Sequence, residues 1–597
     1  MKAGKSVGPP LAVVIFGFLL VASAIVMFTQ QQYFSLLAMV LPILLYVIGF
    51  IIIILPEIIV LPDNKIRTLR LTMLLLFAFL ITIFEGFFDL AGKVGFTASI
   101  VVNYAVPFLF AAAIAAVAIA FVSKKIKQRK LISYLTVAGI VILVYLLLYV
   151  VAKGNGNSDE MIIIFEGIKL FSHGISPYLH GYGTYLAAHA IPPTYYINGT
   201  CACGYIYPAF SFIAFLPIAF ANIKTPEIFI FISVFLEICV GFLIYSRIPK
   251  RSIISVLALF IWFSIALYGA TNAMLAILAI PLLALLAFLY RDRAYVAGLL
   301  LGIAASLQQL AWMLIPFMLV FMYSERGGKH MIKIAAVVAL TFIVLNGYFI
   351  YSKPSILFNN FLIPEGSLEY SGLTLTQLFL GFYHSVRISY AVIEMSVFAA
   401  LLALLYLYPK RLVNLTMGAS VLCILASPRN SIEYIAPFIP LMIVMVVDRP
   451  KKFMRKDVDS AIPAVLVMLV LSVICVVSII YGHSVYQKSD TLSIVNVSGA
   501  GMGNGYVFSV IVRNDGTVPT KVALYYTSRN PNFHTKLMTS YFYMDSVVPS
   551  VVVAPESNAI IFGQLPYQVN NATMLYLQAS SAKYDATEII GIKNITT

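Results

Sequence analysis

The stretch "GNGNSDEMIIIFEGIKLFSHGISPYLHGYG", residues 154–183, directly follows a long apolar run. It opens with two adjacent carboxylates, Asp159 and Glu160. Ionised side chains are costly inside a bilayer, so they gather at its surfaces or at functional positions. The acidic pair therefore marks either a solvated helix start, with Asn157 or Ser158 as the N-cap, or a working site beside a membrane.

Apolar runs dominate the rest of the chain. Of its 597 residues, 61% are hydrophobic and only 11% are charged. A helix of about 20 apolar residues is long enough to cross a bilayer, and the chain contains many such runs. The first run, residues 11–28, lacks a small-residue cleavage site and is followed at once by another, so we expect a retained helix and not a signal peptide. The composition thus predicts an α-helical polytopic membrane protein.

The distribution of positive charge orients this protein. The formal charge is +15, and twenty-five of the 39 Lys and Arg residues stand in short segments between apolar runs. Such segments face the cytoplasm in membrane proteins, so this charge does not indicate a nucleic-acid partner. We expect a multi-pass protein of the plasma membrane with a cytoplasmic amino terminus. The loop 153–206 is then extracytoplasmic.

About 14 to 15 transmembrane helices follow from these rules. Spans are predicted at 11–29, 35–60, 70–90, 98–122, 131–152, 227–245, 252–269, 272–290, 331–350, 388–408, 412–427, 431–447 and 461–482. The run 294–323 has basic flanks at both ends, which favours two short helices that meet outside at Gln308 and Gln309. The run 207–222 would place the basic segment 246–251 outside if it crossed, so we expect it to be re-entrant or juxtamembrane.

The character of the chain changes near residue 486. "GYVFSVIVRNDGTVPTKVALYY" and "SVVVAPESNAIIFGQLP" combine β-branched and aromatic residues with Asn-Asp-Gly and Pro turns. This pattern predicts an extracytoplasmic β-sandwich over 486–597, and the segment loosely resembles immunoglobulin-like modules of cell-surface proteins. Sequons at Asn496, Asn571 and Asn594 agree with an outside location.

The cysteines and histidines do not form a recognisable metal-binding motif. Cys201 and Cys203 in "TCACGY" allow a disulfide or a metal site, and the sequence does not decide between them. The histidines of the loop 153–206 are spaced by seven and nine residues, so no two share a helical turn. We expect no cofactor, although a divalent metal stays open.

The order of motifs from residue 131 to 450 resembles the GT-C fold superfamily of polytopic glycosyltransferases. "DEMIIIFEGIKLFSHGISPY", "LHGYGTYLAAHAIPPTYY" and "YIYPAF" are similar to the family's first extracytoplasmic loop, with an acidic residue just after a spanning helix. "AGLLLGIAASLQQLAWMLIPF" looks like its short helical hairpin, and "SPRNSIEYIAPFIPL" continues the similarity. This chain has Gln308 and Gln309 at the hairpin tip, where the family often has Lys, and its 1–130 segment carries additional helices of unknown role.

The resemblance implies a reaction and a role for each acidic residue. The reaction is transfer of a sugar, with inversion, from a polyprenyl-phosphate donor to an extracytoplasmic lipid, glycan or protein acceptor. Such chemistry needs a carboxylate to take the acceptor proton and cations to stabilise the leaving phosphate. Asp159 is the expected base, with Glu160 as the second candidate. The core would span 131–485.

Further site residues are expected around this base. Arg429 in "ASPRNS" and Arg387 in "YHSVRISY" have planar donors that suit phosphate oxygens. Either arginine could instead extend its side chain toward lipid headgroups. Gln308 and Gln309 could contact the same donor phosphate. Four residues are predicted to bind substrate: Tyr178, His180, Tyr182 and Glu365. The aromatic ones could equally be interfacial residues, and Glu365 could be a solvated loop carboxylate.

Two other classes of function remain open on the sequence. A transporter or lipid flippase also needs many spans, although we find no internal repeat, and the charges cluster in loops. A non-catalytic anchor that displays the β-domain would need only one helix.

Overall fold

A computed structural model describes sixteen segments of the chain. They are residues 8–29, 36–56, 158–189, 202–247, 274–356, 360–361, 371–372, 388–427, 429–430, 432–448, 453–488, 492–502, 505–529, 546–565, 574–580 and 585–591. The predicted spans at 70–90, 98–122, 131–152 and 252–269 lie outside the described residues. So do most of the loop 351–386 and the segment 190–201.

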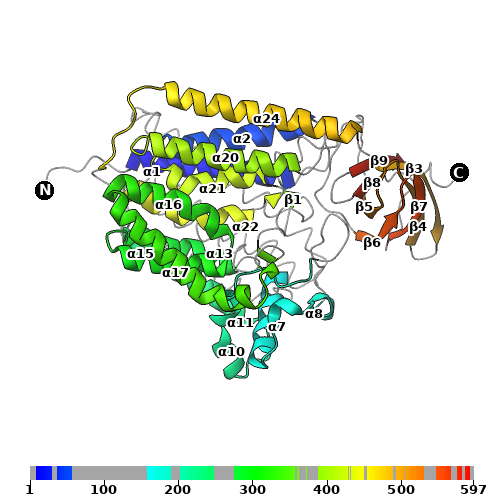
Figure 1. Cartoon of the computed structure of the whole chain (residues 1–597), viewed down its shortest axis with the longest axis horizontal. Coiled ribbons are helices and arrows are strands. Elements are labelled where there is room, and N and C mark those ends of the chain that lie inside the picture. Colours follow the sequence, from blue (N-terminus) through cyan, green and yellow to red (C-terminus); the bar gives the residue numbers. More distant parts are fainter. Residues whose placement is uncertain are drawn as a thin grey trace, which may run out of the picture.

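The described residues up to 488 form a bundle in which most long helices run side by side (Figure 1). The helices are α1 (Gly8–Thr29), α2 (Leu36–Ile54), α7 (Asp159–Ser172), α8 (Gly183–Ala188), α9 (Phe210–Ile213), α10 (Leu216–Phe220), α11 (Ile228–Arg247), α13 (Met274–Ile277), α14 (Leu285–Leu289), α15 (Ala294–Leu307), α16 (Leu310–Arg326), α17 (Gly328–Ser352), α20 (Ile388–Leu407), α21 (Leu415–Ala426), α22 (Ile432–Ile435), α23 (Ile439–Val447) and α24 (Ile462–Lys488). Two 3-10 turns, η2 (Pro177–Leu179) and η5 (Ala436–Phe438), and a π-helical segment, η3 (Leu278–Ala284), are also described.

Three of these helices are long and apolar enough to cross a membrane: α11, α17 and residues 462–481 of α24. The predicted span 272–290 is a helix that widens into η3 around Pro281, and the span 431–447 tightens into η5 at Pro437. Proline lacks the amide hydrogen that an α-helix requires, which explains why both helices change their winding there.

The run 294–323 folds into two antiparallel helices, α15 and α16. Helix α15 ends at Leu307, Gln308 adopts an extended backbone, and α16 starts at Leu310. Arg291, before α15, contacts Glu325, near the end of α16, with 3.0 Å between Nε and Oε2. Asp292 and Arg326 form a second ion pair at the same place. The predicted hairpin is therefore confirmed, while the side of the membrane on which its tip lies stays a prediction.

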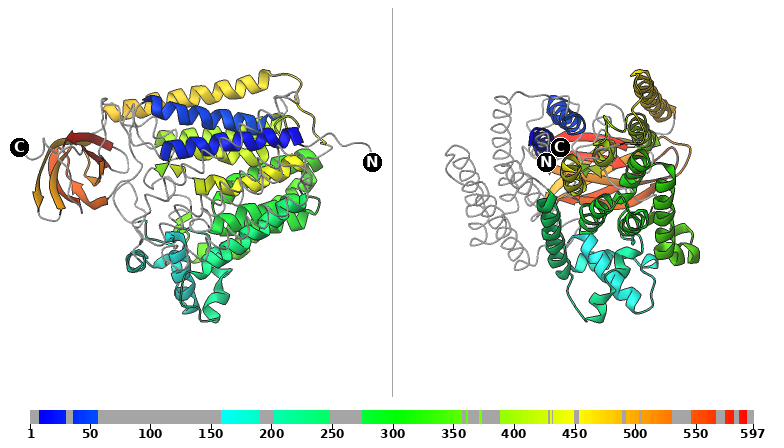
Figure 2. Two further views of the ribbon diagram at one scale, coloured as in Figure 1. Left: turned by 180° about the vertical axis from the view of Figure 1, so that it is seen from behind. Right: turned by 90° about the vertical axis from the view of Figure 1, so that its left-hand side faces the viewer.

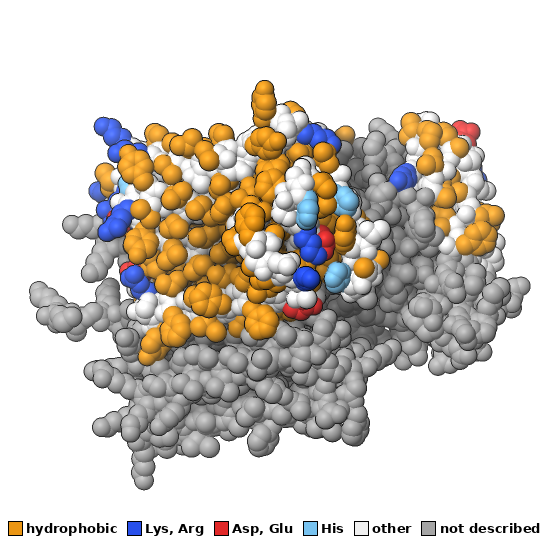
Figure 3. All heavy atoms as spheres, turned by 90° about the horizontal axis from the view of Figure 1, so that it is seen from below, with side chains coloured by type: hydrophobic (Ala, Val, Ile, Leu, Met, Phe, Trp, Pro, Cys, Tyr) orange, Lys and Arg blue, Asp and Glu red, His pale blue; other side chains and the backbone are white. Residues whose placement is uncertain are grey.

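Cations gather at the end of the bundle where this hairpin opens. We call this group the basic rim, and it contains Arg247, Arg291, Arg293, Arg326 and Arg411. Asp448, just after α23, joins two of these arginines, because its Oδ2 lies 3.7 Å from Arg291 Nη1 and 4.0 Å from Arg247 Nη1. Figure 3 shows a broad apolar surface between Lys and Arg side chains at its left edge and a mixed group of His, Lys and acidic side chains nearer the β-strands. Predicted cytoplasmic segments thus share one end of the bundle.

The segment 207–222 is broken into two short helices, α9 and α10, of four and five residues. Neither is long enough to cross a bilayer, which agrees with the predicted re-entrant or juxtamembrane segment. Helix α7 packs on both of them. It runs across the direction of the long helices (Figure 2, left).

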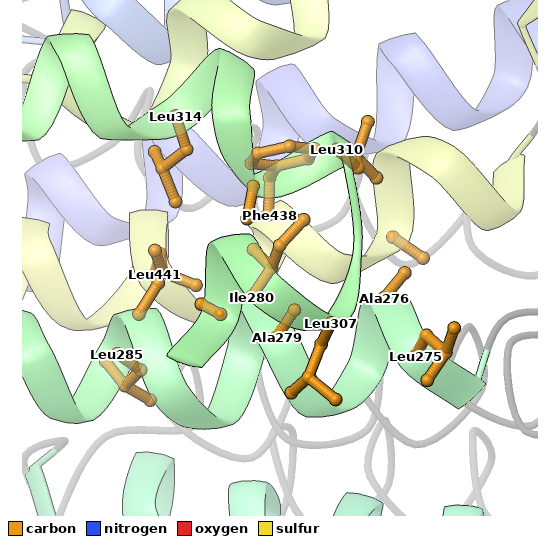
Figure 4. Close-up of a cluster of buried hydrophobic side chains, with 14 of the residues drawn as sticks. Leu275, Ala276, Ala279, Ile280, Leu285, Leu307, Leu310, Leu314, Phe438 and Leu441 are labelled. Carbon is orange, nitrogen blue, oxygen red and sulfur yellow. The ribbon is translucent and has the colours of Figure 1, made fainter. Parts of the chain in front are cut away.

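Small residues allow the closest helix contacts. A Cβ added at Gly298 would lie 2.7 Å from Val337, and one at Gly302 would lie 2.5 Å from Thr341, so α15 touches α17 almost backbone to backbone. Below the hairpin tip, apolar side chains of α13, η3, η5 and α23 meet Leu307 and Leu310 in a buried cluster (Figure 4). These contacts fix the hairpin against the rest of the bundle.

The carboxyl-terminal region forms two antiparallel sheets beyond the end of the bundle opposite the basic rim (Figure 1). The strands are β3 (Leu492–Met502), β4 (Gly505–Asn514), β5 (Thr520–Arg529), β6 (Ser546–Val553), β7 (Ser557–Leu565), β8 (Met574–Ser580) and β9 (Asp585–Gly591). Their orders are β3-β4-β7 and β6-β5-β8-β9, and β6 contacts β7 between the sheets. The predicted change from helix to strand is confirmed, with α24 ending at Lys488, two residues after the expected boundary.

Candidate functional site

The amino end of α7 carries the acidic pair. Ser158 is the N-cap, and its Oγ accepts a hydrogen bond from the Met161 amide at 3.2 Å. The side chain of Asp159 turns back to accept from the Glu160 amide at 2.8 Å and is half-buried. Acidic residues are favoured in the first turn of a helix. The contacts of Ser158 and Asp159 therefore agree with the prediction of a solvated helix start.

Glu160 is used differently from Asp159. It is only 4% exposed, and its Oε1 accepts a hydrogen bond from the Leu275 amide at 2.9 Å. Leu275 lies in the first turn of α13, where backbone amides have no partner within the helix. Glu160 therefore caps a second helix and joins α7 to α13. Asp159 is the more exposed of the two carboxylates.

The position of α13 locates the acidic pair along the bundle. The helix that begins at Met274 ends at Leu289, next to Arg291 of the basic rim. Its amino end, and the Glu160 carboxylate bound to it, therefore lie at the opposite end from the rim. The β-strands lie beyond this same end (Figure 1).

Tyr207 is a tyrosine whose hydroxyl is influenced by the charges of both carboxylates. Burial raises its pKa well above the ordinary value for tyrosine, and the charges of Glu160 and Asp159 raise it further. Tyr434 of α22 also contributes to this shift. The phenol thus stays protonated at neutral pH and lies within the field of both carboxylates. The motifs "YIYPAF" and "SPRNSIEYIAPFIPL" contain Tyr207 and Tyr434, but neither tyrosine was predicted to be a site residue.

Two distant loops pair beside α22. Strand β1 (Ser371–Gly372) pairs in parallel with β2 (Arg429–Asn430), in the register Ser371 to Arg429. Arg429 precedes Tyr434 by five residues, so its backbone is held near the same end of the bundle. The Arg429 side chain lies outside the description, and Arg387 and Glu365 lie outside the described residues altogether.

Gln308 and Gln309, which were predicted to contact phosphate, form hydrogen bonds with the protein backbone. Gln308 and Gln309 are each 8% exposed. The Gln309 side-chain amide donates to the Ile206 carbonyl, and Gln308 Oε1 accepts from the Gln309 backbone amide at 2.9 Å. Gln309 therefore holds protein backbone.

Tyr178 and Tyr182, which the sequence predicts to bind substrate, are both buried against protein in the structure. Tyr178 is 7% exposed, and its ring packs among aromatic side chains, with centroid distances of 5.4 Å to Tyr205 and 5.5 Å to Phe349. Tyr182 is fully buried and donates to the Pro177 carbonyl at 3.1 Å. Both rings are covered by neighbouring side chains, and their role in binding substrate stays a prediction. His180 is half-buried, against the rings of Tyr182 and Tyr185.

The remaining His and Cys residues form no metal centre within the described part of the chain, where no three potential ligands come together. His173 and His189 are exposed at the ends of α7 and α8, and each Nδ1 contacts a backbone carbonyl of its own helix. Cys203 is disulfide-bonded, which resolves the alternatives left open for it, whereas Cys239, Cys423 and Cys475 are free thiols.

Comparison with known proteins finds no family model, no curated protein and no solved structure that matches this chain.

Proposed function

We propose that the chain is a polytopic membrane glycosyltransferase of the GT-C type, which transfers a sugar from a polyprenyl-phosphate donor to an extracytoplasmic lipid, glycan or protein acceptor. It would lie in the plasma membrane with the acidic site and the β-domain outside. The donor, the acceptor and the bilayer are its partners in this proposal.

One observation carries the proposal. A half-buried carboxylate, Asp159, a protonated phenol, Tyr207, and the loop that contains Arg429 belong to separate parts of the chain, yet they gather at one end of the bundle. Inverting transfer to a hydroxyl group needs a base on the acceptor side and positive charge beside the leaving phosphate. Asp159 and Arg429 would supply these two functions.

The membrane setting also supports the proposal. On the face shown in Figure 3, an apolar surface lies between the basic rim and the acidic end. Helix α24 also exposes a row of large apolar side chains, with Val465, Leu469 and Val473 each more than half exposed. Apolar surface of this extent is typical of contact with lipid. The disulfide at Cys203 fits an oxidising compartment on the acidic side.

The test replaces Asp159 by Asn in the full-length chain. Membranes that contain the protein are supplied with synthetic polyprenyl-phosphate mannose bearing radiolabelled mannose, and in parallel with the glucose analogue, and transfer of label is measured. We expect Asp159→Asn to lower the rate by about 100-fold or more, since loss of a general base has an effect of that order.

Glu166→Gln is the matched control. Glu166 lies on the same helix but pairs with Lys169, with 2.8 Å between Oε1 and Nζ, and takes no part in the proposed site. Wild-type rates in Asp159→Asn would contradict the assignment of the base. Absence of transfer by wild type with every donor would instead favour the flippase or the anchor.

A further inference from the structure

The segment Tyr205–Ala209, which carries Tyr207, is held by side chains from four distant parts of the chain. Asn360 Nδ2 donates to the Tyr205 carbonyl at 2.9 Å, and Gln309 donates to the Ile206 carbonyl. The Tyr178 hydroxyl donates to the Tyr207 carbonyl at 2.9 Å. Three successive carbonyls are thus satisfied by side chains and not by secondary structure.

The fourth contact comes from α17. Asn346 is fully buried, and its Oδ1 accepts from the Ala209 amide at 2.7 Å. Its Nδ2 donates to Ser306 Oγ at 3.1 Å and to the Phe342 carbonyl at 3.0 Å. Asn346 therefore joins α15, α17 and the start of α9 in one polar node.

These four residues, Tyr178, Gln309, Asn346 and Asn360, will be called the loop clamp. A buried carbonyl or amide without a partner is costly, so each contact resists any movement of the segment. The ring of Tyr205 adds to this, because it lies against Gly167 of α7 so closely that a Cβ there would come within 2.7 Å of it. The backbone on both sides of Tyr207 is consequently fixed.

We propose that the loop clamp holds the segment that carries Tyr207 against α7, the helix of Asp159 and Glu160, so that the Tyr207 hydroxyl can donate a hydrogen bond to the substrate at the acidic site. The members of the clamp are positioning residues, and the phenol is the group that meets the substrate. Gln309 at the hairpin tip thereby influences the site through its hydrogen bond to the Ile206 carbonyl. This inference rests on the proposed glycosyltransferase function.

The first arm of the test needs no substrate. Gln309→Glu and Asn360→Asp each replace a donor amide by a carboxylate of the same shape. Chymotrypsin is added to the solubilised full-length chain, and cleavage after Tyr205 is followed by mass spectrometry; the Tyr207–Pro208 bond is a poor site because proline follows. We expect cleavage about fivefold faster in each variant, because loss of one hydrogen bond lowers the cost of local opening.

Asn414→Asp is the matched control. Asn414 is a buried asparagine whose Nδ2 donates to the Ile53 carbonyl at 2.9 Å, far along the chain from the clamp. It therefore loses the same kind of contact without affecting Tyr205–Ala209. Cleavage after Tyr205 no faster in Gln309→Glu and Asn360→Asp than in Asn414→Asp would overturn the clamp.

The second arm measures transfer from polyprenyl-phosphate mannose. Asn360→Asp and Tyr207→Phe should each lower kcat about tenfold with the KM of the donor little changed, since misplacement of a reacting group affects the transition state more than binding. Asn414→Asp should keep the wild-type kcat. Faster cleavage with an unchanged kcat would refute the positioning role and leave the proposed function intact. If wild type shows no transfer at all, the proposed function fails with its positioning role, and the cleavage arm alone decides whether the clamp exists.

Discussion

Replacement of Gly302 by Ala should loosen the hairpin and the site together. The added Cβ would lie 2.5 Å from Thr341 Cβ and 3.0 Å from the Val338 carbonyl oxygen. Carbon atoms in contact normally stay about 3.5 Å or more apart, so α15 and α17 must separate locally by about 1 Å. Overpacking of this kind costs about 1–3 kcal/mol.

The same separation should reach the loop clamp one turn further along. Ser306 lies four residues after Gly302, and its hydroxyl is 3.1 Å from Asn346 Nδ2. A shift of about 1 Å exceeds the range of a hydrogen bond, so Asn346 would lose its contact with α15. We therefore expect Gly302→Ala to lower stability by about 2 kcal/mol and to speed cleavage after Tyr205.

Gly347→Ala provides the control within α17. Its Cβ would meet nothing closer than Ile343 at 3.5 Å, an ordinary contact, and alanine is the better helix former by about 1 kcal/mol. Thermal unfolding of the purified chain in detergent should show an apparent Tm for Gly302→Ala about 2 °C below wild type. Equal Tm values for the two variants would refute the argument from close packing.

Two further predictions concern topology and domain structure. Leu179→Cys and Tyr351→Cys, which replace side chains 65% and 89% exposed, should react with an impermeant maleimide from outside intact cells, whereas Met454→Cys, at a position 73% exposed, should react only after permeabilisation. Labelling of Met454→Cys from outside would reverse the proposed orientation. A fragment from Leu492 to the carboxyl terminus should be soluble and show a cooperative unfolding transition, because its two sheets pack on each other; an insoluble or unfolded fragment would mean that the helices are needed for its fold.

Helices and the hairpin could be predicted because their signals are local. The apolar run 331–350 corresponds to α17, which the structure extends to Gly328–Ser352, and the run 227–245 corresponds to α11. The hairpin followed from charge alone, since two basic flanks cannot both stay on one side if the run between them crosses once. Ion pairs between those flanks, such as Arg291 with Glu325, now give that inference a structural basis.

Contacts within the candidate site could not be predicted in this way. The bond from Gln309 to Ile206 joins residues 103 apart, and that from Asn360 to Tyr205 joins residues 155 apart, so no periodic pattern reports them. The burial of Tyr178 and Tyr182 could not be predicted, because a tyrosine beside an apolar run has the same neighbours in sequence whether its ring packs in the protein or faces a ligand. Only tertiary packing separates these cases.

These contacts explain why the hairpin tip carries neutral glutamines and not a lysine. Gln309 is 8% exposed and donates to a carbonyl of a segment whose short helices leave backbone groups without regular partners. Beside a bilayer such groups must be satisfied by protein. A lysine at the tip would bring a formal charge into the same buried place, and an unpaired buried charge costs far more than a neutral amide. A neutral tip leaves recognition of an anionic phosphate to another part of the chain, and in the proposed site that requirement falls on the loop of Arg429.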